Sequence, residues 1–145
     1  SDEVPGLTEL SYDECRCLLA GAALGRVAVS TPMGPRIIPV NYSLADSSIV
    51  FRTTPYSLLG TYARNTNLAF EVDHIDTESQ QGWSVVAVGR ANMVDDLEEL
   101  REIKAEWDPR PWPSGQRSMY FRMPWRELTG RVLSIRGGVG ESATT

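Results

Sequence analysis

The chain has 145 residues, of which 41% are hydrophobic, 8% aromatic and 23% charged. This length and composition predict one globular domain with its own core and exclude disordered and fibrous proteins. The net charge of −5 at pH 7 lacks the positive excess that attracts phosphate backbones, so nucleic acid is not expected as a partner. No stretch approaches the roughly 18 apolar residues of a membrane-spanning helix, so no membrane association is expected.

Cysteine and histidine usage argues against disulfides and metals. Cys15 and Cys17 lie two positions apart in a segment of helical periodicity, where their side chains point to different faces and cannot easily be bridged. With His74 as the only histidine, no zinc site is expected. Free thiols and the lack of a signal-peptide pattern predict a soluble cytoplasmic protein.

The first half of the chain predicts a short helix followed by β-rich runs. Ser11 and Glu14 form a capping box ahead of apolar residues at helical spacing, which continue to Gly21. A second, shorter helix is capped by Ser57 and runs through Ala63. Alternating apolar residues between turn signals predict four strands, which are Arg26–Ser30, Arg36–Leu44, Ile49–Thr53 and Leu68–Val72.

The second half predicts one long strand, a helix and two further strands. The strand Gly82–Val94 is apolar on both faces, so we expect it to be covered on both sides. A helix opens at Asp95 and Asp96 and stops at Pro109, where a proline-rich stretch excludes regular structure. The two last predicted strands are Ser118–Met123 and Gly130–Arg136.

This order of elements predicts the fold class. About seven strands in succession, with helices appended rather than alternating, favour a mainly β protein built on a six- to seven-stranded antiparallel barrel. The same order excludes a parallel, doubly wound sheet. Residues 1–136 are expected to form a single domain, and residues 137–145, rich in Gly, Ser and Thr, a disordered tail.

One segment combines groups that bind anions. Arg52, Thr53 and Ser57 lie where a strand ends and a helix begins, so a guanidinium, two hydroxyls and free backbone N–H groups could together hold a phosphate. An equally weighted alternative is structural: Arg52 pairs with a carboxylate on a neighbouring strand, and Ser57 is only a helix cap. Nearby, Glu71 and Asp73 share a strand face that is best interpreted as solvated.

Several motifs in order resemble one known family. They are Pro39-Val40-Asn41-Tyr42, Phe51-Arg52-Thr53, Leu68–Asp73 and Gly82–Ala91, and with Glu9-Leu10-Ser11, Gly25-Arg26 and Thr129-Gly130-Arg131 they extend over nearly the whole chain. Together they resemble the pyridoxamine 5′-phosphate oxidase-like flavin-binding proteins. The resemblance implies a split β-barrel homodimer that holds FMN, or in some branches a deazaflavin, at the dimer interface. It also implies a flavin-dependent oxidoreductase, whose substrate the motifs do not name.

The resemblance also implies which residues contact the cofactor. The strand from Arg36 to Asn41 would lie along the isoalloxazine ring, and Phe51-Arg52-Thr53 would reach the ring edge and the phosphate. Trp83 and Ser84 match a motif that borders the flavin, and Trp112 matches an element that reaches across from the partner subunit. The full set of expected cofactor-binding residues is Arg36, Ile38, Pro39, Val40, Asn41, Phe51, Arg52, Thr53, Ser57, Leu58, Trp83, Ser84 and Trp112.

Leu58 departs from the family pattern. The family usually places a lysine there to neutralise the phosphate, and each charge-assisted bond that is lost weakens binding by about 1.5–3 kcal/mol. Two readings therefore stand: a flavin-dependent oxidoreductase, and a non-enzymatic dimeric module. The second would be a flavin or haem carrier, or a stress-associated protein that binds no cofactor.

Overall fold

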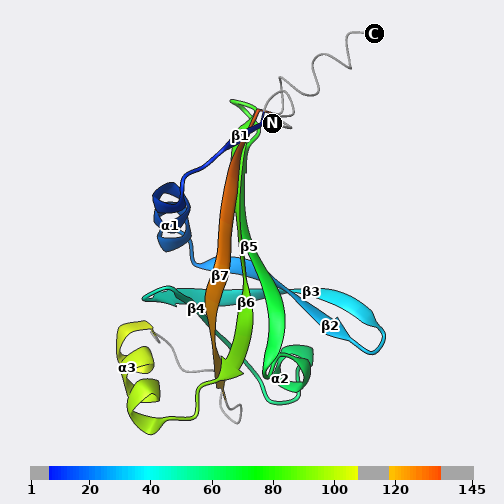
Figure 1. Ribbon diagram of the computed structural model, residues 1–145, viewed down its shortest axis with the longest axis vertical. Helices are drawn as coiled ribbons and strands as arrows, with labels where there is room; N and C mark the ends of the chain where they lie inside the picture. Colours follow the sequence, from blue (N-terminus) through cyan, green and yellow to red (C-terminus); the bar gives the residue numbers. More distant parts are fainter. Residues whose placement is uncertain (1–6, 108–117, 135–145) are drawn as a thin grey trace.

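The computed structural model describes residues 7–107 and 118–134. In these ranges it contains seven strands and three helices (Figure 1). The helices are α1 (Tyr12–Ala20), α2 (Leu58–Tyr62) and α3 (Leu97–Trp107). The strands are β1 (Leu7–Glu9), β2 (Leu24–Thr31), β3 (Gly34–Ala45), β4 (Ser48–Thr53), β5 (Thr66–Asp76), β6 (Gln81–Met93) and β7 (Met119–Ser134).

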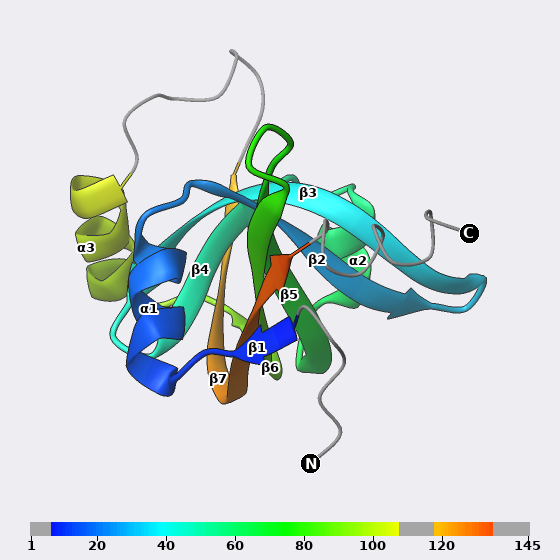
Figure 2. The ribbon, with the colours of Figure 1, turned by 90° about the horizontal axis from the view of Figure 1, so that it is seen from above.

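The strands form one antiparallel sheet that closes on itself. Their order is β1-β7-β4-β3-β2-β5-β6, and β6 also pairs with β7, so six strands make a ring while β1 lies outside it on β7. The mainly antiparallel β fold with appended helices is therefore confirmed. Figure 2 shows α1 and α3 on one side of the ring and α2 on the other, beside the projecting β2–β3 hairpin.

The core lies inside the ring, and a smaller cluster lies beneath α3. The largest fully buried side chains include Tyr42, Phe51, Phe70 and Phe121. The Tyr42 hydroxyl donates a hydrogen bond to the carbonyl oxygen of Leu19, which ties α1 to the ring, and burial raises the pKa of Tyr42 to about 12. The smaller cluster packs α3 on β4 and β7, and on the residue that follows β6, through Val50, Val94, Ile103 and Tyr120.

The helix caps agree with the sequence patterns. Ser11 accepts a hydrogen bond from the Glu14 N–H, and the Glu14 carboxylate accepts one from the Ser11 N–H, so the predicted capping box is present. Asp96 accepts a hydrogen bond of 2.9 Å from the Glu99 N–H at the start of α3. Cys15 and Cys17 are both free thiols. Because α1 turns them to different faces, Cys15 is buried and Cys17 is exposed.

The end of the sheet differs from its prediction. The two strands expected at Ser118–Met123 and Gly130–Arg136 are, within the described residues, one continuous strand, β7. Pro124 did not end the strand, because it is exposed and pairs with Ser48 at the last rung against β4. Beyond Pro124 the chain continues along β6, which is bulged between Val88 and Gly89.

Other boundaries also differ. β5 extends past the predicted Val72 to Asp76, because its pairing with β6 continues to Gln81. The three-residue strand β1 was missed, since so short a run carries no periodicity. The β6 face that carries Val85 and Ala87 is buried. The opposite face, with Ser84, Val86 and Val88, is only half-buried, so a single chain covers the strand fully on one of the two sides expected.

Two further expectations concern the C-terminal tail and membrane-spanning helices. The expected tail at 137–145 lies outside the described residues, so the domain boundary stays a prediction. Among the helices of residues 7–107 and 118–134, none has the length and apolar character needed to cross a membrane.

Candidate functional site

A pocket of about 240 Å³ opens between the adjacent strands β3 and β4. Its lining consists of Ile38, Pro39, Val40 and Asn41 from β3, Arg52 and Thr53 from the end of β4, and Thr54 directly after it. These two segments meet because β3 and β4 form a hairpin in which Tyr42 pairs with Phe51. The sequence predicted every lining residue except Thr54, which directly follows the predicted pair and could have been found from that position.

The loop after β4 is fixed by the side chain of Ser57. Its hydroxyl donates to the Thr54 carbonyl oxygen at 2.8 Å, accepts from the Gly60 N–H at 3.0 Å, and lies 2.6 Å from the Thr53 hydroxyl. Ser57 is thus the cap of α2, the role that the alternative to a phosphate site assigned to it. It does not line the pocket, but it holds two residues that do.

Gly60 makes this tight loop possible. A Cβ at this position would lie 2.4 Å from the Thr54 carbonyl oxygen and 2.7 Å from that of Pro55, so any side chain would push α2 away from the loop. The five-residue helix α2 therefore packs directly against the backbone that forms the pocket floor. The contacts of Ser57 and Gly60 with Thr54 therefore set the shape of the pocket where Thr54 lines it.

Arg52 lies half-buried on β4, between the buried residues Phe51 and Thr53. Because successive side chains alternate across a strand, Arg52 faces away from the core that its neighbours fill. Its Cζ atom lies 5.4 Å from the centroid of the Trp107 ring, over the ring face. Arg52 thus borders both the pocket and the C-terminal end of α3.

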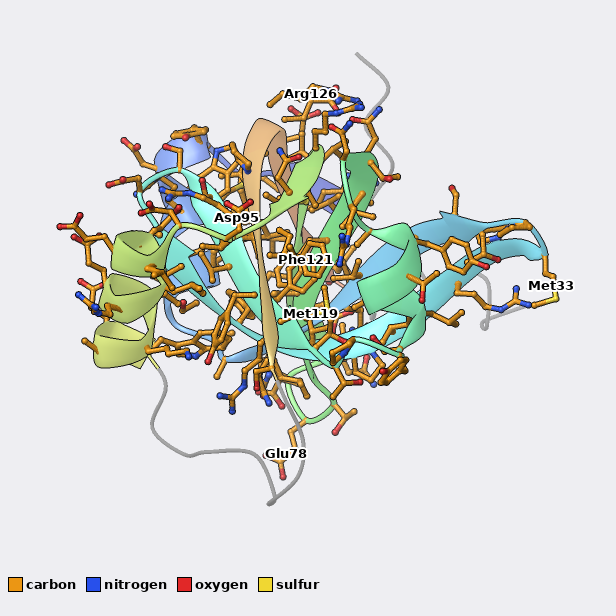
Figure 3. All side chains as sticks on the ribbon, turned by 90° about the horizontal axis from the view of Figure 1, so that it is seen from below. Met33, Glu78, Asp95, Met119, Phe121 and Arg126 are labelled. Carbon is orange, nitrogen blue, oxygen red and sulfur yellow. The ribbon has the colours of Figure 1, made fainter. Side chains whose placement is uncertain are left out.

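Besides Ser57, three further predicted site residues on β3, β4 and α2 lie outside this pocket's lining. Phe51 is fully buried and stacks on Phe121, with ring centroids 5.4 Å apart. Arg36 lies near the tip of the β2–β3 hairpin, which Met33 marks in Figure 3, and its Nη1 donates to the Pro35 carbonyl oxygen at 3.2 Å. Leu58, at the start of α2, is 37% exposed.

The predicted residues on β6 belong to a second place on the surface. Ser84 lines a separate pocket of about 290 Å³ between β6 and β7, together with Val86, Thr129, Gly130 and Arg131. Trp83 is half-buried and packs on the core, and the centroid of its ring lies 6.5 Å from that of the His74 ring. Trp112 lies outside the described residues. In one chain, therefore, six of the expected cofactor residues line the pocket between β3 and β4, Ser84 lines a separate pocket, and the other expected residues within the described ranges line neither of the two.

The carboxylates of β5 form an ion-pair cluster with β2. Arg26 Nη2 lies 3.2 Å from a carboxylate oxygen of Glu71 and 2.8 Å from one of Asp73. The hydrogen bond from Arg26 lowers the pKa of Asp73, whereas partial burial raises the pKa of Glu71. The strand face expected to be merely solvated is therefore an ion-paired one.

Comparison with known proteins gives one consistent result. The family model for pyridoxamine 5′-phosphate oxidase matches residues 11–132. An uncharacterized protein of Mycobacterium tuberculosis is 33% identical over 99 residues, a match that spans 65% of this chain and 65% of that protein.

Two solved structures are similar to this chain in both fold and sequence. An FAD-binding protein of Mycobacterium smegmatis has a TM-score of 0.72 and 31% identity over 87% of this chain and 98% of its own. A conserved protein of unknown function from Corynebacterium diphtheriae has a TM-score of 0.76 and 30% identity over 88% of this chain and 98% of its own.

Proposed function

Because the chain belongs to the pyridoxamine 5′-phosphate oxidase-like family, we propose that it binds a flavin, with FMN as the ligand, and acts as a flavin-dependent oxidoreductase. The observation that carries this proposal is the convergence of the β3 residues Ile38–Asn41 and the β4 residues Arg52 and Thr53 on one pocket. The similarity to an FAD-binding protein of Mycobacterium smegmatis supports a flavin as the class of ligand.

The chemistry of the pocket fits a flavin. The β3 side of the pocket is apolar: Pro39 is exposed there, and Ile38 and Val40, which pack on the core, contribute the strand's edge, a surface of the kind on which a flat aromatic ring packs. Asn41 and Thr53 add hydrogen-bonding groups, and Arg52 adds a positive charge suited to a phosphate. A wall of apolar side chains with few polar groups at its end is the usual make-up of a cofactor site.

The second part of the proposal is a homodimer in which two chains complete each site. The pocket of about 240 Å³ is smaller than the roughly 300–1,000 Å³ of most ligand sites. Exposed apolar side chains lie on the strands beside it, among them Leu24 (57% exposed) and Ile37 (70% exposed). Pairing two chains would cover these side chains and bring the pocket around Ser84 of the partner subunit to the flavin.

The work of this chain's residues is to bind and orient. A bound flavin supplies two-electron hydride chemistry, which no side chain can provide. Ile38–Val40 exclude water from one side of the ring, and Asn41 and Thr53 fix its orientation through hydrogen bonds. Arg52 neutralises the anionic end of the ligand. The chain of contacts from Gly60 through Ser57 to Thr53 keeps the polar groups in place.

A titration with three ligands tests the proposal. Purified protein is titrated with FMN, FAD and a deazaflavin cofactor, and flavin fluorescence quenching is followed while sedimentation measures the oligomeric state. We expect saturable binding of FMN at micromolar or lower Kd, with one flavin per chain in a dimer. Absence of saturable binding of all three would overturn the proposal in favour of the non-enzymatic module. Tighter binding of FAD or the deazaflavin would replace FMN as the ligand.

A further inference from the structure

A chain of stacked side chains connects α3 to the pocket. Lys104 Nζ lies 5.7 Å from the centroid of the Tyr120 ring. The Tyr120 ring meets that of Trp107 edge to face, with centroids 6.1 Å apart and planes at 81°. Trp107 in turn lies under the guanidinium of Arg52, which lines the pocket. The residue that carries the pocket's positive charge therefore rests on a ring supplied by a different element.

Trp107 itself is held in place by packing. It belongs to the partly buried side chains that pack on the cluster of Val50, Val94, Ile103 and Tyr120. Tyr120 is only 2% exposed and pairs with Arg52 across β4 and β7. Because Tyr120 is rigidly placed, the indole that it supports offers Arg52 a fixed surface. An arginine side chain has several rotatable bonds, so such a surface limits the positions that its guanidinium can adopt.

We propose that Trp107 is a positioning residue that holds Arg52 against the pocket, so that the site selects flavins carrying a phosphate over riboflavin. This inference rests on the proposed function. A guanidinium stacked on a ring uses its face for that contact, and its N–H groups point outward in the guanidinium plane, the direction from which a phosphate is bound. With Leu58 in place of the family's lysine, the orientation of Arg52 carries more of the selection than it would beside a second cation.

A second arginine–tryptophan pair provides the matched control. Arg16 Cζ also lies 5.4 Å from a tryptophan centroid, that of Trp125. Neither Arg16 nor Trp125 lines the pocket between β3 and β4. The two pairs have the same chemistry and the same separation, and they differ in whether the arginine faces the pocket.

The experiment measures Kd for FMN and for riboflavin in the full chain by flavin fluorescence quenching, with thermal unfolding measured in parallel. Trp107→Leu is expected to raise the FMN Kd by about five- to thirtyfold, the range that the loss of one cation–π contact predicts. The riboflavin Kd should stay unchanged. Trp107→Tyr should restore most of the preference for FMN, and Trp125→Leu should not alter it.

A double-variant cycle separates positioning from general support. If Trp107 acts through Arg52, Trp107→Leu has no further effect on the FMN Kd once Arg52→Ala is present. Equal weakening of FMN and riboflavin by Trp107→Leu would overturn the inference, as would a wild-type chain that binds both equally well. A preference for FMN that persists in Trp107→Leu would also overturn it while leaving flavin binding intact. A wild-type chain that binds neither ligand would overturn the proposed function itself.

Discussion

Arg52 on β4 and Arg26 on β2 occupy comparable places on strands, but their surroundings differ. Arg26 lies between the carboxylates of Glu71 and Asp73, which neutralise it and link β2 to β5. Arg52 rests on the ring of Trp107 and borders a pocket. An aromatic face holds a guanidinium without cancelling its charge, so the contact with Trp107 differs in kind from the ion pairs that offset the charge of Arg26.

The same contrast applies to Arg122. It is paired with Glu99 and Asp46 and donates to the Ser48 hydroxyl, so its charge serves the contact between α3 and the start of β4. The arginines Arg26 and Arg122 therefore join elements through ion pairs, whereas Arg52 lines the pocket between β3 and β4. The neighbours of each guanidinium, rather than its exposure, distinguish these roles.

The largest effect is expected from removing the core side chain that supports the strand at Arg52. Phe51 is fully buried and stacks on Phe121, so Phe51→Ala should lower the free energy of unfolding by about 3–5 kcal/mol. Urea denaturation measures this loss. The control Leu97→Ala truncates a side chain at the start of α3 that is 71% exposed and should change stability little. A loss below about 1 kcal/mol in Phe51→Ala would contradict the assignment of Phe51 to the core.

The second way is to remove each arginine in turn. Arg52→Ala should raise the FMN Kd at least about tenfold, because a charge-assisted hydrogen bond contributes roughly 1.5–3 kcal/mol. Arg26→Ala should leave the FMN Kd unchanged, since that side chain is committed to Glu71 and Asp73. Fluorescence titration gives both values. If the two variants behave alike, Arg52 has no special place in the site.

Restoring the family's lysine should sharpen the contrast. Leu58 is 37% exposed, so a lysine there can keep its ammonium group hydrated while it reaches a phosphate. We expect Leu58→Lys to tighten FMN binding by up to about tenfold and to leave riboflavin binding unchanged. Thr61→Lys, on the same short helix, adds the same charge as a control. Equal gains in both variants would indicate a general charge effect.

The smallest effect is expected at the ion pair of β2 and β5. Asp73→Asn should lower the free energy of unfolding by about 0.2–1 kcal/mol at pH 7, as for other partly exposed pairs. The pKa of Asp73 is lowered in the folded chain, so its contribution is present above the ordinary value and is lost as the pH falls through the lowered one. Denaturation at pH 7 and below about pH 4 should show the difference disappear. A difference that persists in acid would exclude the ion pair as its cause.

The sequence was informative wherever the relevant residues are close along the chain. Ile38–Asn41 and Arg52–Thr53 gather in one pocket because they lie on consecutive strands of a hairpin, whose alternation of apolar residues was readable. The caps at Ser11 and Ser57 were found for the same reason, since each contact spans three residues. Local patterns thus predicted the two strands, and the resemblance to the family singled out the residues on them that line the pocket.

What the sequence missed depends on contacts between distant elements. The stack of Trp107 on Arg52 requires knowing that α3 lies over β4, which no local pattern indicates. The continuity of β7 past Pro124 depends on its pairing with β6, which begins at Phe121 beside the β4 pairing and continues to Ser134. The placement of Ser84 in a second pocket likewise follows from the pairing of β6 with β7.

The pairing of β7 has a consequence for synthesis on the ribosome. β7 follows every other described strand in the chain, yet it pairs with β1, β4 and β6 and closes the ring. A nascent chain therefore keeps the edges of β4 and β6 open until residues 119–134 have emerged from the exit tunnel. Open edges invite pairing with other chains. The interval between the emergence of β6 and that of β7 is thus when this protein is most exposed to aggregation and most in need of a chaperone.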